Sequence, residues 1–196
     1  MKLTAILGSP RAGGNTDTIA QCVLDGATAA GLETETVALR KLRLHGCSAC
    51  EKCWERRGRP CTWQDDMDEV YDIIAGSDVL LFATPVYWYA PTSIMKAFID
   101  RLVPFNRPQG RTLIEGKRAI LVTAYEEEGP AAAEPMIRMF EMSFDYLGLQ
   151  FTDRIVVDGV GPRGAILNKP DALTRAYEIG FNLAPPQSVS SPGGED

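Results

Sequence analysis

The sequence predicts an α/β protein built on a doubly wound sheet of five parallel strands, in the order 2-1-3-4-5, with helices on both faces. Short runs of aliphatic and β-branched residues alternate along the chain with segments whose apolar residues recur at helical spacing. Two of these runs, VLLFAT (79–84) and RAILVT (118–123), are continuously apolar, which is typical of strands that are covered on both faces. This alternation of strand and helix favours a parallel sheet over an antiparallel one.

The remaining strands are expected where β-branched and aliphatic residues cluster between turn residues. They are KLTAIL (2–7), ETETVAL (33–39) and FTDRIVVDGV (151–160). A segment of about 25 residues without clear periodicity follows the second strand, which is longer than a simple turn requires. We therefore expect an insertion there, at the same edge of the sheet as the other loops that follow strands.

Helices are expected between the strands, each with one apolar face. The first should end at Gly31, the second should begin at Asp65 or Asp66, the third should span 92–103, the fourth should begin near Pro135, and the last should span 171–183. The inward residues expected for the first four helices are Ile19, Val23, Ala27 and Ala30; Met67, Val70, Ile73 and Ile74; Ile94, Ala97, Phe98 and Leu102; and Met136, Met139, Phe140, Phe144 and Leu147.

Length and composition suit a single domain. The 196 residues include 45% hydrophobic residues, enough for a core without disulfides, and we expect one domain over 1–183 with a disordered Pro/Ser/Gly-rich tail over 184–196. The chain has no signal-peptide pattern and no apolar run of membrane-spanning length, which predicts a cytoplasmic protein without a membrane partner. Its net charge of −6 argues against nucleic acid as a partner.

The loop GSPRAGGNT (8–16) follows the first strand and opens the first helix. Ser9, Asn15 and Thr16 offer neutral donors and Arg11 offers a charged one, while Gly14 lets the backbone approach a ligand at the helix N-terminus. The loop matches neither the P-loop nor the dinucleotide fingerprint. It predicts a site for one phosphate group, the alternative being a glycine-rich turn that merely caps a helix.

A second loop, TPVYWYAP (84–91), follows the third strand. In the predicted strand order the direction of winding reverses between strands 1 and 3, so this loop and 8–16 should flank one crevice. Its prolines stiffen the backbone, and Tyr87, Trp88 and Tyr89 offer aromatic surface to a flat ring. The alternative is that these aromatic residues pack beneath the next helix.

Four of the five cysteines lie in one short segment with the pattern C-x2-C-x2-C-x7-C. They are Cys47, Cys50, Cys53 and Cys61. The triplet resembles that of bacterial ferredoxins and favours a 4Fe–4S cluster, with zinc or uncoordinated thiols as alternatives. Seven Lys/Arg residues against two glutamates over 40–59 would offset the charge of such a cluster. Cys22 is expected to be a buried residue of the first helix, and His45 a loop residue rather than a ligand.

The two loops together carry a family resemblance. GSPRxxGNT followed by TPVYWYAPTSIMKAFIDR resembles the NAD(P)H-dependent FMN reductases, and the cysteine spacing resembles the iron–sulfur flavoprotein branch of that family. The resemblance covers most of residues 1–150. It implies a flavodoxin-like fold and non-covalently bound FMN.

The resemblance also implies which residues would hold the cofactor. The phosphate would lie on Ser9, Arg11, Asn15 and Thr16, in the loop that contains Gly14, and the isoalloxazine would contact Pro85, Val86, Tyr87 and Trp88. A third flavin loop would follow strand 4 at 123–130, beginning at Thr123, with Glu126, Glu127 and Glu128 facing solvent. Members of the family form dimers or tetramers with the flavin near a subunit interface.

Three functions are compatible with the sequence. The first is an FMN-dependent oxidoreductase that passes electrons between FMN and a 4Fe–4S cluster, with NAD(P)H or another small molecule or protein as electron donor or acceptor. The second is a cluster-free NAD(P)H-dependent FMN or quinone reductase, and the third is a zinc-stabilised module without enzymatic activity. No catalytic side chain is predicted, because the flavin would carry the chemistry.

Overall fold

The computed structural model describes residues 1–55 and 60–184 and contains one parallel sheet with the strand order β2-β1-β3-β4-β5. The strands are β1 (Lys2–Leu7), β2 (Glu33–Ala38), β3 (Val79–Ala83), β4 (Arg118–Ala124) and β5 (Gln150–Val157). The predicted fold class is confirmed, with the cysteine-rich segment after β2. The fifth strand ends three residues earlier than predicted, because the chain turns at Gly159, whose φ is +64°.

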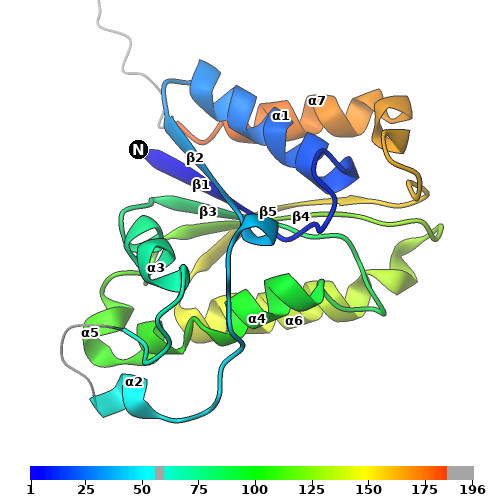
Figure 1. Ribbon diagram of the computed structural model, residues 1–196. Helices are drawn as coiled ribbons and strands as arrows, with labels where there is room; N and C mark the ends of the chain where they lie inside the picture. The colour runs from blue at the N-terminus through cyan, green and yellow to red at the C-terminus, as the bar shows by residue number, and fades with distance from the viewer. Residues whose placement is uncertain (56–59, 185–196) are drawn as a thin grey trace, which may run out of the picture.

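Helices cover both faces of the sheet (Figure 1). The α-helices are α1 (Asn15–Ala29), α2 (Lys52–Glu55), α3 (Met67–Ala75), α4 (Ser93–Asp100), α5 (Pro108–Arg111), α6 (Glu134–Leu147) and α7 (Pro170–Phe181). Short 3-10 turns lie at η1 (Leu39–Lys41), η2 (Val103–Asn106), η3 (Pro130–Ala132) and η4 (Ala165–Asn168). One face carries α1 and α7, and the other carries α3, α4 and α6.

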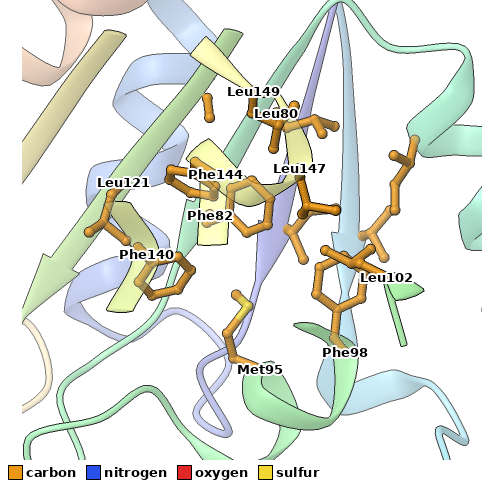
Figure 2. Close-up of a cluster of buried hydrophobic side chains, with 14 of the residues drawn as sticks. Leu80, Phe82, Met95, Phe98, Leu102, Leu121, Phe140, Phe144, Leu147 and Leu149 are labelled. Carbon is orange, nitrogen blue, oxygen red and sulfur yellow. The ribbon is translucent and has the colours of Figure 1, made fainter. Parts of the chain in front are cut away.

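The core on the α4–α6 face is aromatic. Phe82 of β3 packs against Phe98 of α4 and against Phe140 and Phe144 of α6, with ring centroids 4.9–6.3 Å apart (Figure 2). Such packing buries aromatic side chains of two helices against one strand and fixes the position of α4 on the sheet. This core therefore also holds in place the loop 84–91, which precedes α4.

Five of the expected inward side chains are only partly buried, and one of them is Ala30, at the C-cap of α1. The helix predicted at 92–103 is shorter, running from Ser93 to Asp100, because the Thr92 hydroxyl caps it by accepting from Met95 N and a 3-10 turn follows it. This start turns Met95 and Phe98 fully inward, while Ile94 and Ala97 are half-buried. In α3 and α6, Tyr71 and Ile137 are buried in place of Ile73 and Met139, which are half-buried.

Two further sequence predictions concern the chain ends and the membrane. The tail predicted over 184–196 lies, apart from Ala184, outside the described residues. Among the helices of the described ranges, none has the length and hydropathy that a transmembrane segment needs.

Candidate functional site

A crevice lies at the carboxyl ends of the strands, between the loops that follow β1 and β3. Its cavity measures about 190 Å³. Eight of the residues predicted to bind a cofactor line it: Ser9, Arg11, Gly14, Asn15, Thr16, Pro85, Val86 and Tyr87. The segments after β4 and β5 complete the wall. Four of its residues belong to the segment 123–130 that was expected as a third flavin loop: Ala124, Tyr125, Glu126 and Glu127. The sequence motifs did not indicate the other three: Val160, Gly161 and Arg163.

The loop 8–16 is shaped so that the N-terminus of α1 opens into this crevice. The Ser9 hydroxyl and the Arg11 backbone close a tight turn at 3.2 Å, and Gly13 adopts φ +62°. No side chain from the described part of the chain caps α1 at Gly14, so the first-turn N–H groups point to the cavity without a capping oxygen. An anion is the ligand that such a helix terminus favours.

A buried ion pair supports this loop from beneath. Asp17 Oδ2 lies 3.0 Å from Arg40 Nη1 and accepts a hydrogen bond from Gly13 N at 3.0 Å, while Arg40 also donates to Ser9 O. Burial raises the pKa of Asp17, and the Gly13 N–H and Arg40 oppose that rise by stabilising the carboxylate. The pair therefore fixes both ends of the turn.

Asn15 has a different task from the predicted one. Its side-chain Nδ2 donates to Val160 O at 2.7 Å and Pro162 O at 2.9 Å, and its Oδ1 accepts from Gly164 N at 3.0 Å and from Ile166 N. All its amide hydrogens and its oxygen are thus engaged with the loop after β5. The side chain fastens that loop to the loop 8–16 and leaves only its backbone N–H for a phosphate.

Arg163 lies at the crevice because of this fastening. Its Nε donates to Gly13 O at 3.2 Å, and its side chain lines the cavity together with Arg11. Two guanidinium groups therefore flank the α1 N-terminus. No local sequence pattern indicates Arg163, because it lies in an irregular loop about 150 residues away from the loop 8–16.

The aromatic loop forms a tight hairpin turn. Tyr87 and Ala90 pair through two backbone hydrogen bonds of 2.8 and 3.1 Å, and the two residues between them have positive φ, 51° for Trp88 and 62° for Tyr89. Bulky residues in this conformation are strained, and such strain concentrates at functional sites. Tyr87 lines the crevice, whereas Trp88 is 93% exposed and lines a neighbouring hollow with Tyr89, Glu127 and Ala132.

The end of β4 and the loop that follows it depart in part from expectation. Thr123 is fully buried, and its Oγ1 has no partner among the described residues, so it lies behind the cavity wall that Ala124 and Tyr125 form. Glu126 and Glu127 are exposed, as expected, but they also line the crevice. The crevice wall therefore carries acidic as well as basic side chains.

A second cavity gathers all four clustered cysteines. Cys47, Cys50, Cys53 and Cys61 line a cavity of about 30 Å³ together with residues of α3 and the α4–η2 turn. The pKa of Cys50 falls to about 7, chiefly through a hydrogen bond with the Thr62 hydroxyl and further ones from the Lys52 backbone and Ser48. Burial raises the pKa of Cys53, and repulsion from the other three sulfurs adds to the rise. The four thiols thus line one cavity, and Cys53 is close enough to the other three to feel their charge.

The four thiols do not form a ready-made site for a single metal ion. Within the described residues, no three Cys, His, Asp or Glu side chains converge tightly enough for a single ion. In a four-iron cluster each thiolate binds a different iron, so the sulfurs stand further apart than around zinc. The basic residues Arg56, Arg57 and Arg59, predicted to offset a cluster's charge, lie outside the described residues.

The cysteine segment is held by a buried ion pair at the end of α4. Arg101 and Asp65, each with a side chain only 1% exposed, make two hydrogen bonds of 2.8 and 3.0 Å, and Arg101 also donates to His45 O at 2.8 Å. His45 stacks on Trp63 with ring centroids 4.3 Å apart, and its Nδ1 lies 3.2 Å from Asp65 Oδ2. These contacts join the beginning of the segment to its end.

This anchoring places the segment away from the flavin loops, contrary to the sequence expectation. The two cavities share no lining residue, and α4 (Figure 1) extends from one toward the other. Thr92, just before the first turn of α4, donates a hydrogen bond to Gly8 O near the crevice, whereas Asp100 and Arg101 at the other end of the helix line the cysteine cavity. Eight helical residues span about 12 Å. Strand β2 ends near the crevice, but the chain then runs away from it along the face of the sheet that carries α4.

The Asp65–Arg101 pair should make stability depend on pH. Burial of Asp65 acts to raise its pKa, but hydrogen bonds from Arg101 and His45 outweigh it and hold the pKa well below its usual range. A depressed pKa stabilises the fold above the unfolded value of about 3.9, and this stabilisation is lost as the pH falls below it. We expect Asp65→Asn to lower the free energy of unfolding of the metal-free protein by about 1–3 kcal/mol at pH 7, with a smaller difference at pH 3.

Urea denaturation at pH 7, 5 and 3 measures this difference. Asp72→Asn, an exposed change on α3, is the matched control and should have little effect at any of these pH values. A difference between wild type and Asp65→Asn that stays constant down to pH 3 would contradict the assignment.

Comparison with known proteins agrees with this architecture. Residues 1–150 match the model of the family described as NADPH-dependent FMN reductase. A protein of Archaeoglobus fulgidus named iron-sulfur flavoprotein is 33% identical over 129 residues, which cover 66% of this chain and 56% of that protein. A second protein of the same name and organism is 31% identical over 187 residues, covering 94% of this chain and 90% of that protein.

Solved structures show the same fold at lower identity. The NAD(P)H:quinone oxidoreductase from Methanothermobacter marburgensis superimposes with a TM-score of 0.75 at 20% identity, covering 93% of this chain and 96% of that one. The chain spans only about half the length of some of the curated relatives that it matches. The match over 1–150 is nevertheless most of the chain, and the protein belongs to the NADPH-dependent FMN reductase family, as an FMN-dependent oxidoreductase.

Proposed function

We propose that this oxidoreductase holds FMN in the crevice and a 4Fe–4S cluster on Cys47, Cys50, Cys53 and Cys61, and that it transfers electrons between a reduced donor such as NAD(P)H and an acceptor. The observation that carries the proposal is the gathering of all four cysteines on one cavity, in a protein whose family binds FMN. The names of the archaeal relatives support the same reading. A cytoplasmic location remains part of the proposal.

The crevice residues fit FMN. The open N-terminus of α1 and the guanidinium groups of Arg11 and Arg163 suit its phosphate, which carries up to two negative charges. Pro85, Val86 and Tyr87 form a stiff wall for the isoalloxazine. When bound, the flavin supplies the redox chemistry, since it accepts two electrons and can release them one at a time. The protein positions the ring and limits its contact with water.

The cysteine cavity fits an anionic iron–sulfur group. Its donor set is four thiols, and its wall contains the buried guanidinium of Arg101, whose Nε has no partner within the described residues. Backbone strain occurs here as well, because Ala49 and Glu51, between the ligands, have φ of 51° and 59°. These two turns support the proposal that the segment folds around a bound group.

We also propose that the protein assembles as a homodimer or homotetramer. Within one chain α4 separates the two cavities, and apolar side chains are exposed at the turn (Trp88 and Tyr89) and on α6 (Met142 and Tyr146). A second copy on these surfaces would bury them and would let the cysteine site of one subunit approach the crevice of another.

Sedimentation of the FMN-bound protein at micromolar concentration tests the assembly. We expect a dimer or tetramer for the wild type, and a shift toward monomer for Trp88→Ser with Met142→Ser, because both substitutions remove exposed apolar surface. A wild type that sediments as a monomer would contradict the assembly.

The experiment that tests the cofactors is anaerobic purification of the full chain, followed by its visible spectrum and a count of FMN, iron and sulfide. We expect one FMN and four irons per chain, with NADH or NADPH bleaching the flavin absorbance. Full FMN without iron after anaerobic reconstitution would leave the cluster-free NAD(P)H reductase as the function.

A further inference from the structure

We propose that Arg101 is the positioning residue of the cysteine site: its terminal nitrogens close the cysteine segment, and its Nε–H donates a hydrogen bond to a sulfur of the site. The second role rests on the proposed cluster. Arg101 touches neither the crevice nor any residue that lines it within the described ranges, so its role concerns the cysteine site alone.

The terminal nitrogens join two points that are distant in sequence. Nη1 donates to His45 O and to Asp65 Oδ2, both at 2.8 Å, and Nη2 donates to Asp65 Oδ1 at 3.0 Å. His45 lies just before Cys47, and Asp65 lies just after Cys61. One side chain therefore brings the first and last cysteines of the motif to the same cavity.

The third nitrogen of the guanidinium group is left with an unused donor. Nε is buried and has no partner among the described residues, although the Arg101 side chain is only 1% exposed. Buried N–H groups without an acceptor are rare, and each one calls for an explanation. Two residues with oxygen acceptors lie beside the guanidinium group: Asp65 accepts from its terminal nitrogens, and the Tyr71 hydroxyl, which donates to Arg101 O, is also close enough to interact with the Arg101 side chain. Neither residue makes a hydrogen bond with Nε.

Sulfur is the acceptor that the surroundings offer. Arg101 lines the same cavity as all four cysteines, and so does Tyr71, whose hydroxyl donates to Arg101 O. A charged N–H donor favours an anionic acceptor. Hydrogen bonds and positive charge at cluster sulfurs raise the reduction potential, so Arg101 would make the site a better electron acceptor.

Only arginine can both bridge His45 and Asp65 with its terminal nitrogens and donate a hydrogen bond from Nε. Lysine keeps the positive charge but has one nitrogen centre, which can pair with Asp65 or approach the sulfurs but cannot reproduce the planar fork. Arg101→Lys therefore separates charge from geometry. The matched control is Arg43→Lys, because Arg43 belongs to the same basic segment and its side chain is 91% exposed.

The experiment uses the anaerobically reconstituted full chain of each variant. For Arg101→Lys we expect fewer irons per chain, a lower reduction potential in a dye-mediated titration and an altered paramagnetic signal of the reduced protein, with FMN content unchanged. Arg43→Lys should match the wild type in each respect. Asp65→Asn keeps the Nε–H donor, so it should reduce iron retention without lowering the potential.

A measurement on the wild type covers the case in which Arg101→Lys does not fold. Protein labelled with ¹⁵N only at arginine should show a ¹⁵N hyperfine coupling to the reduced site. An unchanged potential in Arg101→Lys, or no coupling in the labelled wild type, overturns the Nε role while leaving the cluster in place. Wild-type protein that binds FMN but no iron overturns the proposed cluster itself, and the Nε role with it.

Discussion

Cys53→Ala should abolish iron binding while leaving FMN at one per chain. Cys53 is, with Cys61, one of the two half-buried members of the four cysteines, and it interacts with the other three sulfurs, so its loss removes a ligand from the inner side of the site. Cys50, by contrast, is exposed and has a pKa of about 7. The flavin should stay because the two cavities share no lining residue. Iron and flavin analysis after anaerobic reconstitution, with the visible spectrum, measures both.

Cys22→Ala is the matched control for this loss. Cys22 lies in α1, on the opposite face of the sheet from the cysteine segment, and packs against that face's core. It should therefore retain wild-type iron content and spectrum. A Cys53→Ala protein that keeps four irons and an unaltered spectrum would show that Cys53 is not a ligand.

Arg11→Ala combined with Arg163→Ala should weaken FMN binding by two orders of magnitude or more. Each guanidinium group can give the phosphate a charge-assisted hydrogen bond worth about 1.5–3 kcal/mol, and a total of about 2.8 kcal/mol corresponds to a hundredfold change in affinity. Fluorescence titration of the flavin-free protein measures the affinity. Arg175→Ala removes an exposed arginine of α7 that does not line the crevice, and it should change nothing.

Titration with riboflavin distinguishes a loss of phosphate recognition from a collapse of the loop 8–16. Because riboflavin lacks the phosphate, the double variant should bind it as the wild type does. Asn15→Ala should instead weaken both ligands, because the Asn15 side chain fastens the loop after β5 rather than contacting a phosphate. Equal losses for FMN and riboflavin in the double arginine variant would contradict the assignment of Arg11 and Arg163.

Periodicity was a sufficient guide to the fold because the sheet is covered on both faces. Runs such as VLLFA in β3 contain no polar residue that could face solvent, so both sides of the strand must be buried. The order of strands and helices then limits the topology to a few arrangements. Side-chain orientation within helices was less predictable. Met95 rather than Ile94 points inward because the Thr92 cap sets where α4 begins, and a shift of one residue rotates the apolar face by about 100°.

By itself the sequence determined the residue chemistry of both sites: the loop 8–16 opens a helix, the aromatic loop follows β3, and four cysteines share one segment. Local spacing suffices for these because each motif lies within one connection between elements. Only the tertiary structure decided that Asn15 fastens a loop about 150 residues away, that Arg163 joins Arg11, and that Arg101 and Asp65 hold the cysteine segment at the far end of α4. These pairings depend on which elements become neighbours in the packed sheet, and no short-range pattern in the chain encodes a contact between residues that distant.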